Sequence, residues 1–115
     1  MGQLSKEIFV CLDCETTGLD PQKDSIIEVA VTKFRLDAMV DQFETLVDPQ
    51  RLIPSESTEI HNITDSMVVG KPTIDQVLPD LLNFVSGHPI VGHGITFDID
   101  ELCASAERAG IPCRL

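Results

Sequence analysis

Two carboxylates stand two residues apart in the stretch IFVCLDCETTGLDP, which begins at Ile8. The residues before them are almost all apolar, so Asp13 and Glu15 lie at the end of what reads as a buried β-strand. Residues two apart in a strand project to the same face, which brings the two carboxylates together. Two buried charges of one sign repel each other and lose hydration, so the pair requires compensation.

Divalent metal ions are one compensation that this pattern favours. The nearest basic residues along the chain are Lys6 and Lys23, and neither adjoins the acidic pair. Mg²⁺ and Mn²⁺ prefer oxygen ligands, and two such ions about 4 Å apart suit phosphoryl chemistry. A shared proton, or a solvated strand end with no function, is the alternative interpretation.

A third carboxylate, Asp98, opens the last predicted helix within the segment VGHGITFDIDEL. Ligand sites of α/β folds form where strands end and helices begin, so Asp98 is a candidate to join the first two acids. The alternative is a structural acid in the first helical turn, where a carboxylate favours the helix dipole. His61 and His93 are likewise open to a functional or a purely structural interpretation.

The apolar pattern predicts an α/β fold with a mixed sheet and the element order β-β-β-α-β-α. Strands are expected at residues 8–15, 25–34, 40–47 and 89–92. Short turns join the first three strands, which favours an antiparallel meander. The first strand is apolar on both faces before its acids, as a central strand would be. One helical turn is expected around residues 57–60.

Two helices complete this order. The first begins near Thr73, where Gln76 completes a capping box. Pro79 lies inside its pattern and removes a hydrogen bond, so we expect a kink or a later start. The second helix begins at residue 96 and stops at Gly110. Four of its residues are expected to point inward: Ile99, Leu102, Cys103 and Ala106.

The composition fits a single globular domain of 115 residues, 43% of them hydrophobic and 23% charged. No apolar run approaches the roughly 18 residues that cross a bilayer, and the first residues lack a signal-peptide layout, so a cytoplasmic location is expected. The net charge of −11 argues against broad binding to nucleic acid, which depends on lysine and arginine. It is compatible with bound divalent metal, or with a nucleic-acid end delivered by a partner.

The four cysteines stand at positions 11, 14, 103 and 113. Cys11 and Cys14 form a C-x-x-C pair, but residues three apart in a strand point to opposite faces and cannot share a metal ion or a disulfide. The cysteines are expected to be ordinary buried thiols.

Three segments together resemble the DEDD-type 3′–5′ exonucleases. FVCLDCETTGLDPQKDSIIEVAV resembles the first motif, with Asp13 and Glu15 as the signature pair. IHNIT, which contains His61, resembles the family's HGIT segment, and IVGHGITFDIDEL resembles the second motif with its catalytic Asp98. The resemblance covers residues 8–112, and within the family it is to the proofreading epsilon subunits of bacterial DNA polymerase III.

The resemblance implies an RNase H-like fold and removal of 3′-terminal nucleotides from DNA as monophosphates. Three residues would be catalytic and hold two divalent cations, Mg²⁺ or Mn²⁺: Asp13, Glu15 and Asp98. One ion would activate water and the other would stabilise the leaving oxygen. Asp13 and Glu15 would also contact the substrate, together with four further residues: Thr16, Thr17, Glu56 and His61. The implied partners are a single-stranded 3′ end and a polymerase subunit.

The sequence departs from the family pattern in three places. Gly94 and Ile95 stand where the second motif has Asn-Ala, so the asparagine amide is missing. Asn62 replaces the glycine of HGIT, a mild change because asparagine tolerates the left-handed conformation. The third motif, with a general-base histidine and a fourth aspartate, has no counterpart, so residues 1–115 are expected to be a C-terminally incomplete domain that is inactive or impaired by itself.

Two other functions stay open at this point. One is an RNA-trimming exonuclease of the same family, because no residue decides between ribose and deoxyribose. The other is a non-catalytic interaction module on the same fold, which the missing third motif favours and the three intact acids disfavour.

Overall fold

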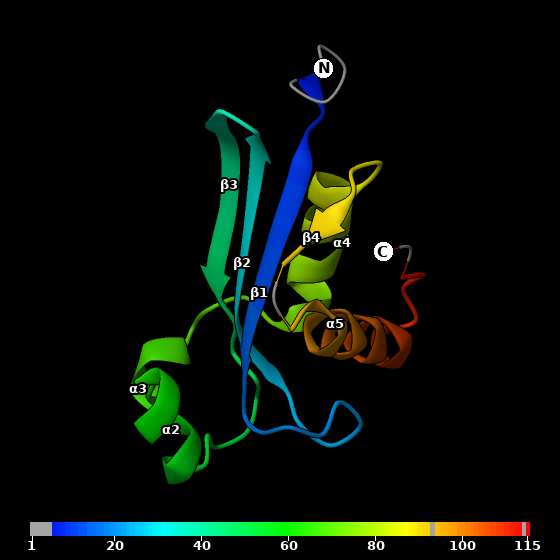
Figure 1. The fold of residues 1–115 in the computed structure, drawn as a ribbon. Coiled ribbons are helices and arrows are strands. Elements are labelled where there is room, and N and C mark those ends of the chain that lie inside the picture. Colours follow the sequence, from blue (N-terminus) through cyan, green and yellow to red (C-terminus); the bar gives the residue numbers. More distant parts are fainter. Residues whose placement is uncertain (1–5, 93, 114) are drawn as a thin grey trace.

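The computed structural model describes residues 6–92, 94–113 and 115, and within them it forms a four-stranded mixed sheet (Figure 1). The strand order is β3-β2-β1-β4. The first three strands form an antiparallel meander, and the short β4 pairs with β1 in parallel. The strand bounds are Phe9–Thr16 for β1, Ile26–Arg35 for β2, Ala38–Leu46 for β3 and Ile90–Val91 for β4. The predicted mixed sheet and meander are confirmed.

The two faces of β1 differ in exposure. Val10, Leu12 and Cys14 are buried in the main core, whereas Cys11 and Asp13 on the opposite face are exposed. The helices α4 (Ile74–Val85) and α5 (Ile95–Ala109) lie on one side of the sheet in Figure 1. The strand β1 is central in the sheet as predicted, since β2 and β4 flank it, but among the described residues these helices cover only one of its faces.

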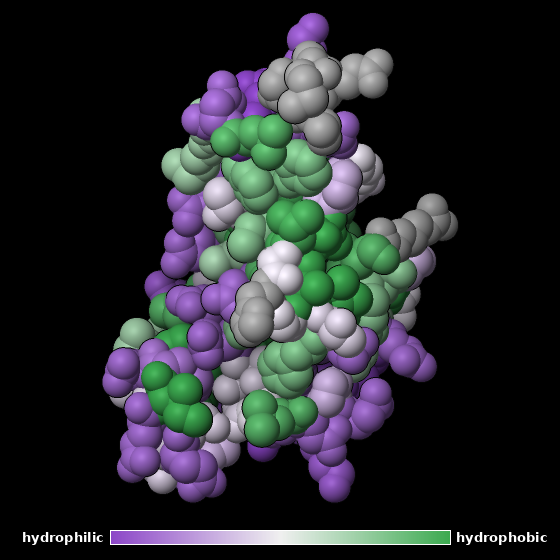
Figure 2. Space-filling model, in the orientation of Figure 1, coloured by the Kyte–Doolittle hydropathy of each residue, from purple (hydrophilic) through white to green (hydrophobic). Residues whose placement is uncertain are grey.

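Apolar residues also gather outside the core. Figure 2 shows them over the middle of the visible face, around β1 and β4, while hydrophilic residues dominate the edge formed by β3. The rings of Phe9 and Phe34 lie 5.9 Å apart between their centroids on the uncovered face. On the uncovered face of the sheet, Phe9 and Phe34 therefore form an apolar end, and the acids of β1 lie toward the other end.

The helix α4 begins as predicted and continues through its proline. The Thr73 N–H donates to Gln76 Oε1 at 3.0 Å, which confirms the capping box. The predicted later start is wrong, since α4 runs from Ile74 with Pro79 inside it. The ring of Pro79 leaves the Asp75 carbonyl without its helical donor, and both residues are exposed, so water can solvate that carbonyl.

Two short helices replace the single turn expected around residues 57–60. They are α2 (Ser55–His61) and α3 (Asp65–Val68), so the order is β-β-β-α-α-α-β-α rather than the predicted one. A second small core holds this unit against β2; it consists of Ile27, Ile53, Ile63 and Val68. Asn62 ends α2 with φ +64°, the left-handed conformation that its residue type tolerates.

The helix α5 ends at Gly110, whose φ of +70° turns the chain back toward the helix. This return places Cys113 beside Cys103, with 5.3 Å between their Cα atoms, and the two form a disulfide. The expectation of four buried thiols is therefore wrong, because Cys11 is also exposed and Cys14 alone is a buried thiol. Leu102 and Ala106 are fully buried as predicted, and Ile99 and Cys103 are half-buried.

Within the described ranges, no helix is both long enough and apolar enough to cross a membrane.

Asn62→Ala is expected to lower the free energy of unfolding by about 1 kcal/mol, because a Cβ-bearing residue without a polar side chain is strained at positive φ. Asn62→Gly should leave it within about 0.5 kcal/mol of the wild type. Urea unfolding of both variants measures this, with Asn83→Ala on the exposed side of α4 as control. Equal losses in the Ala and Gly variants would contradict the account.

Candidate active site

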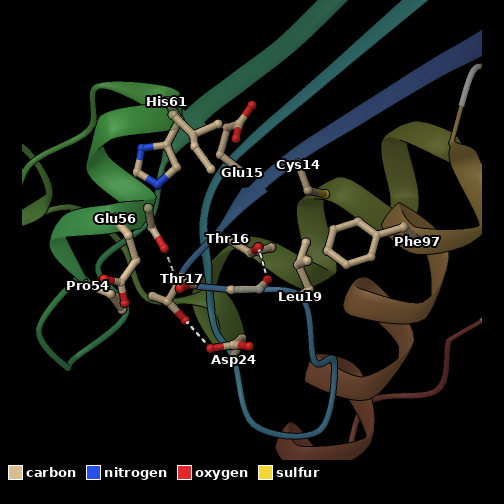
Figure 3. A pocket seen from close by; sticks show the side chains of 13 residues that line it. Cys14, Glu15, Thr16, Thr17, Leu19, Asp24, Pro54, Glu56, His61 and Phe97 are labelled. Atoms are coloured by element: carbon tan, nitrogen blue, oxygen red, sulfur yellow. Dashed lines mark hydrogen bonds between the residues drawn. The ribbon is translucent and has the colours of Figure 1, made fainter.

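A pocket of about 520 Å³ opens at the end of β1, between the β1–β2 loop and α2 (Figure 3). Five of the residues predicted to act in catalysis or substrate binding line it: Glu15, Thr16, Thr17, Glu56 and His61. The other two predicted residues, Asp13 and Asp98, are not among its lining residues. The pocket therefore collects the predicted substrate-binding residues other than Asp13, from β1, the residue that follows it and α2.

Thr17 fixes the floor of this pocket through bonds within the protein. Its hydroxyl accepts from the Ser25 N–H at 2.9 Å and donates to Asp24 Oδ1 at 3.0 Å. Its carbonyl accepts from the Ser57 hydroxyl at 2.7 Å, which ties β1 to α2. The Thr16 hydroxyl donates to the carbonyl of Gly18. Both threonine hydroxyls are therefore engaged inside the protein, so a ligand would meet mainly backbone and methyl groups here.

His61 lines the pocket, and one of its ring nitrogens has no hydrogen-bond partner among the described residues. As the last residue of α2, it accepts the Ile63 N–H at its Nδ1 atom, at 3.0 Å. An imidazole that accepts at Nδ1 carries its proton at Nε2. The Nε2 atom is buried and has no hydrogen-bond partner among the described residues. A buried donor without a partner costs free energy, so this atom is ready to donate to a ligand.

Asp98 lies beneath β1 rather than in the pocket. It stands in the first turn of α5, is 5% exposed, and its Oδ1 accepts the Cys14 N–H at 3.2 Å. Cys14 is the residue between the two acids of β1. Burial raises the pKa of Asp98 to about 6, the Cys14 N–H opposes this, and the charges of Asp13 and Glu15 raise the pKa further. The three carboxyl groups therefore interact as like charges.

The chemistry of this donor set suits a hard divalent cation. Burial, followed by the charge of Asp98, raises the pKa of Cys14 well above its usual range, so the thiol stays protonated and the available ligands are oxygens. Among the described residues, however, no three His, Cys, Asp or Glu side chains are close enough to hold an ion. The ligand set Asp13, Glu15 and Asp98 therefore stays a prediction. His93 lies outside the described residues.

A family model for exonucleases, RNase_T, matches residues 10–111 of the chain. The chain belongs to the RNase_T exonuclease family. Its fold agrees with this assignment, because it superimposes on exonuclease I with a TM-score of 0.81 at 18% identity, over 91% of this chain and 25% of the other.

Relatives with higher sequence identity to this chain include proteins named as parts of DNA polymerase III. The DNA polymerase III PolC-type protein of Thermotoga petrophila is 47% identical over 78% of this chain and 7% of its own length. The DNA polymerase III epsilon subunit of Treponema pallidum is 38% identical over 84% of this chain and 45% of its own length. Exonuclease X in complex with 5′ overhanging duplex DNA has 33% identity and a TM-score of 0.69, over 82% of this chain and 53% of the other. The chain thus spans less than half the length of these two polymerase relatives.

Sequence reasoning missed the apolar residues of the pocket. Leu19 and Ile60 line it at 86% and 82% exposure, and Phe97 adds an aromatic ring. A signal was present, because each lies beside a predicted site residue or motif: Leu19 follows TTG, Ile60 precedes His61 and Phe97 precedes Asp98. Exposed apolar side chains around a pocket are typical of a binding site.

Sequence reasoning also missed Glu28, which the pairing of β1 with β2 places beside the predicted site. It stands opposite Glu15 in the antiparallel register of β1 and β2. Burial and then the charges of Glu44, Glu15 and Asp13 raise the pKa of Glu28. The uncovered face of the sheet therefore carries more negative charge next to the predicted metal ligands than β1 alone supplies.

Glu101 lies on α5, three residues after Asp98. It is fully buried, and both carboxyl oxygens lack a hydrogen-bond partner among the described residues. Burial raises its pKa to about 7; the charge of Asp24 raises it further, Arg108 opposes, and Asp20 and Asp98 add smaller increases. A neutral carboxylic acid is the form that this environment favours near and below pH 7.

Glu101→Gln is expected to flatten the pH dependence of stability. The folded pKa of Glu101 lies above the usual 4.5, so the folded state binds more protons and the free energy of unfolding falls as the pH rises from 4.5 to about 7. Asp98 shifts in the same direction, so part of the slope persists in the variant. Urea unfolding between pH 4.5 and 8 measures the slopes. Glu107→Gln, exposed on the same helix, is the control, and a slope unchanged in Glu101→Gln would contradict the account.

Proposed function

We propose that this chain is the part of a metal-dependent 3′–5′ exonuclease that binds the 3′ end of DNA and holds the catalytic cations. The enzyme would remove 3′-terminal nucleotides as monophosphates during proofreading of DNA replication. The observation that carries the proposal is the pocket that joins Glu15, Glu56 and His61, whose Nε2 atom has no hydrogen-bond partner among the described residues. Near this pocket, the Asp98 carboxylate accepts the Cys14 N–H. Membership of the RNase_T exonuclease family supports the same reaction class.

In this proposal Asp13, Glu15 and Asp98 hold Mg²⁺ or Mn²⁺. When bound, such ions activate water and stabilise the leaving oxygen. The chain's own contribution is positioning, because the Cys14 N–H fixes the Asp98 carboxylate beneath the strand that carries the other two acids. Among the described residues, no basic side chain forms an ion pair with these acids. Their negative charge is therefore available to bind the cations.

The other pocket residues would hold the terminal nucleotide. The His61 Nε2–H is proposed to donate to the phosphate or the nucleotide, which satisfies the buried donor. Leu19, Ile60 and Phe97 offer apolar and aromatic contact to bases, which every base can accept whatever its identity. Glu56 and the backbone at Thr16 and Thr17 complete the proposed contacts.

We propose further that a polymerase partner places this chain on its substrate in the cytoplasm. The net charge of −11 gives the chain little attraction of its own for a phosphate backbone. Relatives named as a DNA polymerase III subunit and as a PolC-type DNA polymerase III support such an assembly.

The wild-type chain is expected to bind Mn²⁺ in calorimetry and Asp13→Asn to lose this binding, because the substitution deletes a proposed ligand oxygen and one of the charges that the cation compensates. Circular dichroism should stay unchanged, since Asp13 is exposed on the uncovered face. Asp37→Asn removes the same charge in the exposed turn between β2 and β3 and should bind Mn²⁺ as the wild type does. Equal Mn²⁺ binding by Asp13→Asn would contradict the ligand assignment.

Thymidine 5′-monophosphate, a product of the proposed reaction, is expected to bind the wild-type chain in the presence of Mn²⁺ more tightly than in its absence. Uridine 5′-monophosphate serves as the ribose competitor in the same calorimetric titration. Tighter binding of the ribonucleotide would favour the RNA-trimming alternative. Failure of both nucleotides to bind while Mn²⁺ binds would favour the non-catalytic module.

A further inference from the structure

The loop between β1 and β2, residues 17–25, forms one wall of the pocket through Thr17, Gly18, Leu19 and Asp24. We propose that Asp24 and Arg108 are positioning residues that hold this loop, and with it Leu19, in the geometry that receives the 3′-terminal nucleotide. The inference rests on the proposed exonuclease function of the same pocket. It assigns a role to two charged residues to which the sequence analysis gave none: Asp24, inside the segment that resembles the first motif, and Arg108, outside the quoted segments.

Asp24 closes the loop from within. Its Oδ1 accepts the Thr17 hydroxyl at 3.0 Å, and its Oδ2 accepts the Asp20 N–H at 2.9 Å. The carboxylate lies so close to Gly18 that a Cβ built there would sit 2.5 Å from Asp24 Oδ2. The bond between Thr17 and Asp24 is visible in Figure 3. One side chain therefore spans the loop and sets the path of the backbone that leads to Leu19.

Arg108 holds the same loop from outside. It projects from the last turn of α5, and its guanidinium donates to the Pro21 carbonyl at 3.0 Å and to the Asp24 carbonyl at 3.5 Å. It also contacts the Ser105 hydroxyl of its own helix at 3.4 Å. Since α5 carries Asp98 in its first turn, one helix places both a proposed metal ligand and the anchor of the pocket wall.

A second arginine, Arg51, also contacts the loop. Arg51 donates to the Lys23 carbonyl at 2.7 Å, and its guanidinium lies 4.0 Å from Asp24 Oδ1. Both arginines are exposed, and we centre the inference on Arg108 because it donates to two carbonyls of the loop and belongs to the helix that carries Asp98.

The loop presents Leu19 to the pocket at 86% exposure, which contributes little to the core. Such a side chain gains burial when a base packs on it, provided that the loop holds it in place. Asp24 itself is a carboxylate and repels phosphate. Charge alone therefore predicts that removal of Asp24 tightens binding of DNA, whereas a positioning role predicts weaker binding.

The opposite signs give a direct test with Asp24→Ala. The probe is a single-stranded DNA oligonucleotide with 2-aminopurine as its 3′-terminal base and a phosphorothioate at the last linkage, titrated in Mn²⁺. Asp24→Ala is expected to weaken the affinity about tenfold and to change the terminal-base fluorescence at saturation. An internal 2-aminopurine should report no such change. Asp37→Ala, which removes the same charge outside the pocket, is the matched control.

Substitutions of Arg108 are tested with the same oligonucleotide. Arg108→Ala should weaken the affinity more than Arg35→Ala, which removes an equal charge at the exposed end of β2, and Arg108→Lys should restore part of it. Gly18→Ala should reproduce the Asp24→Ala defect by displacing the carboxylate, and the two changes together should be less than additive. Melting midpoints establish that each variant is folded, and Asp24→Asn replaces Asp24→Ala if the latter unfolds.

If the wild type binds the oligonucleotide and Asp24→Ala binds it as tightly as Asp37→Ala or more tightly, the inference is overturned. A wild type that binds Mn²⁺ but shows no affinity for the 3′ end would overturn the proposed function itself, and the inference with it.

Discussion

The hydrogen bond from the Cys14 N–H to the Asp98 carboxylate is the interaction on which the site depends. It joins the first turn of α5 to the middle of β1, 84 residues away along the chain. Through it, the buried carboxylate lies beneath the strand segment that carries Asp13 and Glu15. The rest of α5 is thereby placed so that Arg108 reaches the β1–β2 loop. The packing of α5 against the sheet therefore positions both the carboxylate of Asp98 and the wall of the pocket.

This arrangement concentrates negative charge where the protein supplies little to offset it. Burial raises the pKa values of Asp98 and Glu101, and burial together with the surrounding carboxylates holds the Cys14 thiol in its protonated form. Such an environment costs folding free energy in the absence of a ligand, because buried charges lose their hydration. This environment also favours binding of cations over binding of phosphate alone. In the proposed function, the bound cations then attract the phosphate of a nucleic-acid end to a chain of net charge −11.

Much of the fold was accessible from the sequence because local chemistry determined it. The capping box at Thr73, the left-handed Asn62 and the same-face acids of β1 each follow from neighbouring residues. The buried Glu101 was not, since the helical pattern assigned inward positions by hydropathy, whereas α5 faces the polar β1–β2 loop as well as the core. The pocket wall was missed for a related reason: the partners of Asp24 come from the start of its own loop, from α5 and from the segment before α2, and only the tertiary fold brings them together.

Paramagnetic broadening by Mn²⁺ tests most directly where the cation binds. In amide spectra of the isotopically labelled chain, substoichiometric Mn²⁺ should first erase the signals of residues 13–16 and 97–99. These segments meet at the bond between Cys14 and Asp98, so selective loss there is the result that the account predicts. Broadening centred on Glu28 and Glu44, on the loop around Asp20 and Asp24, or spread evenly over the acidic surface would contradict it.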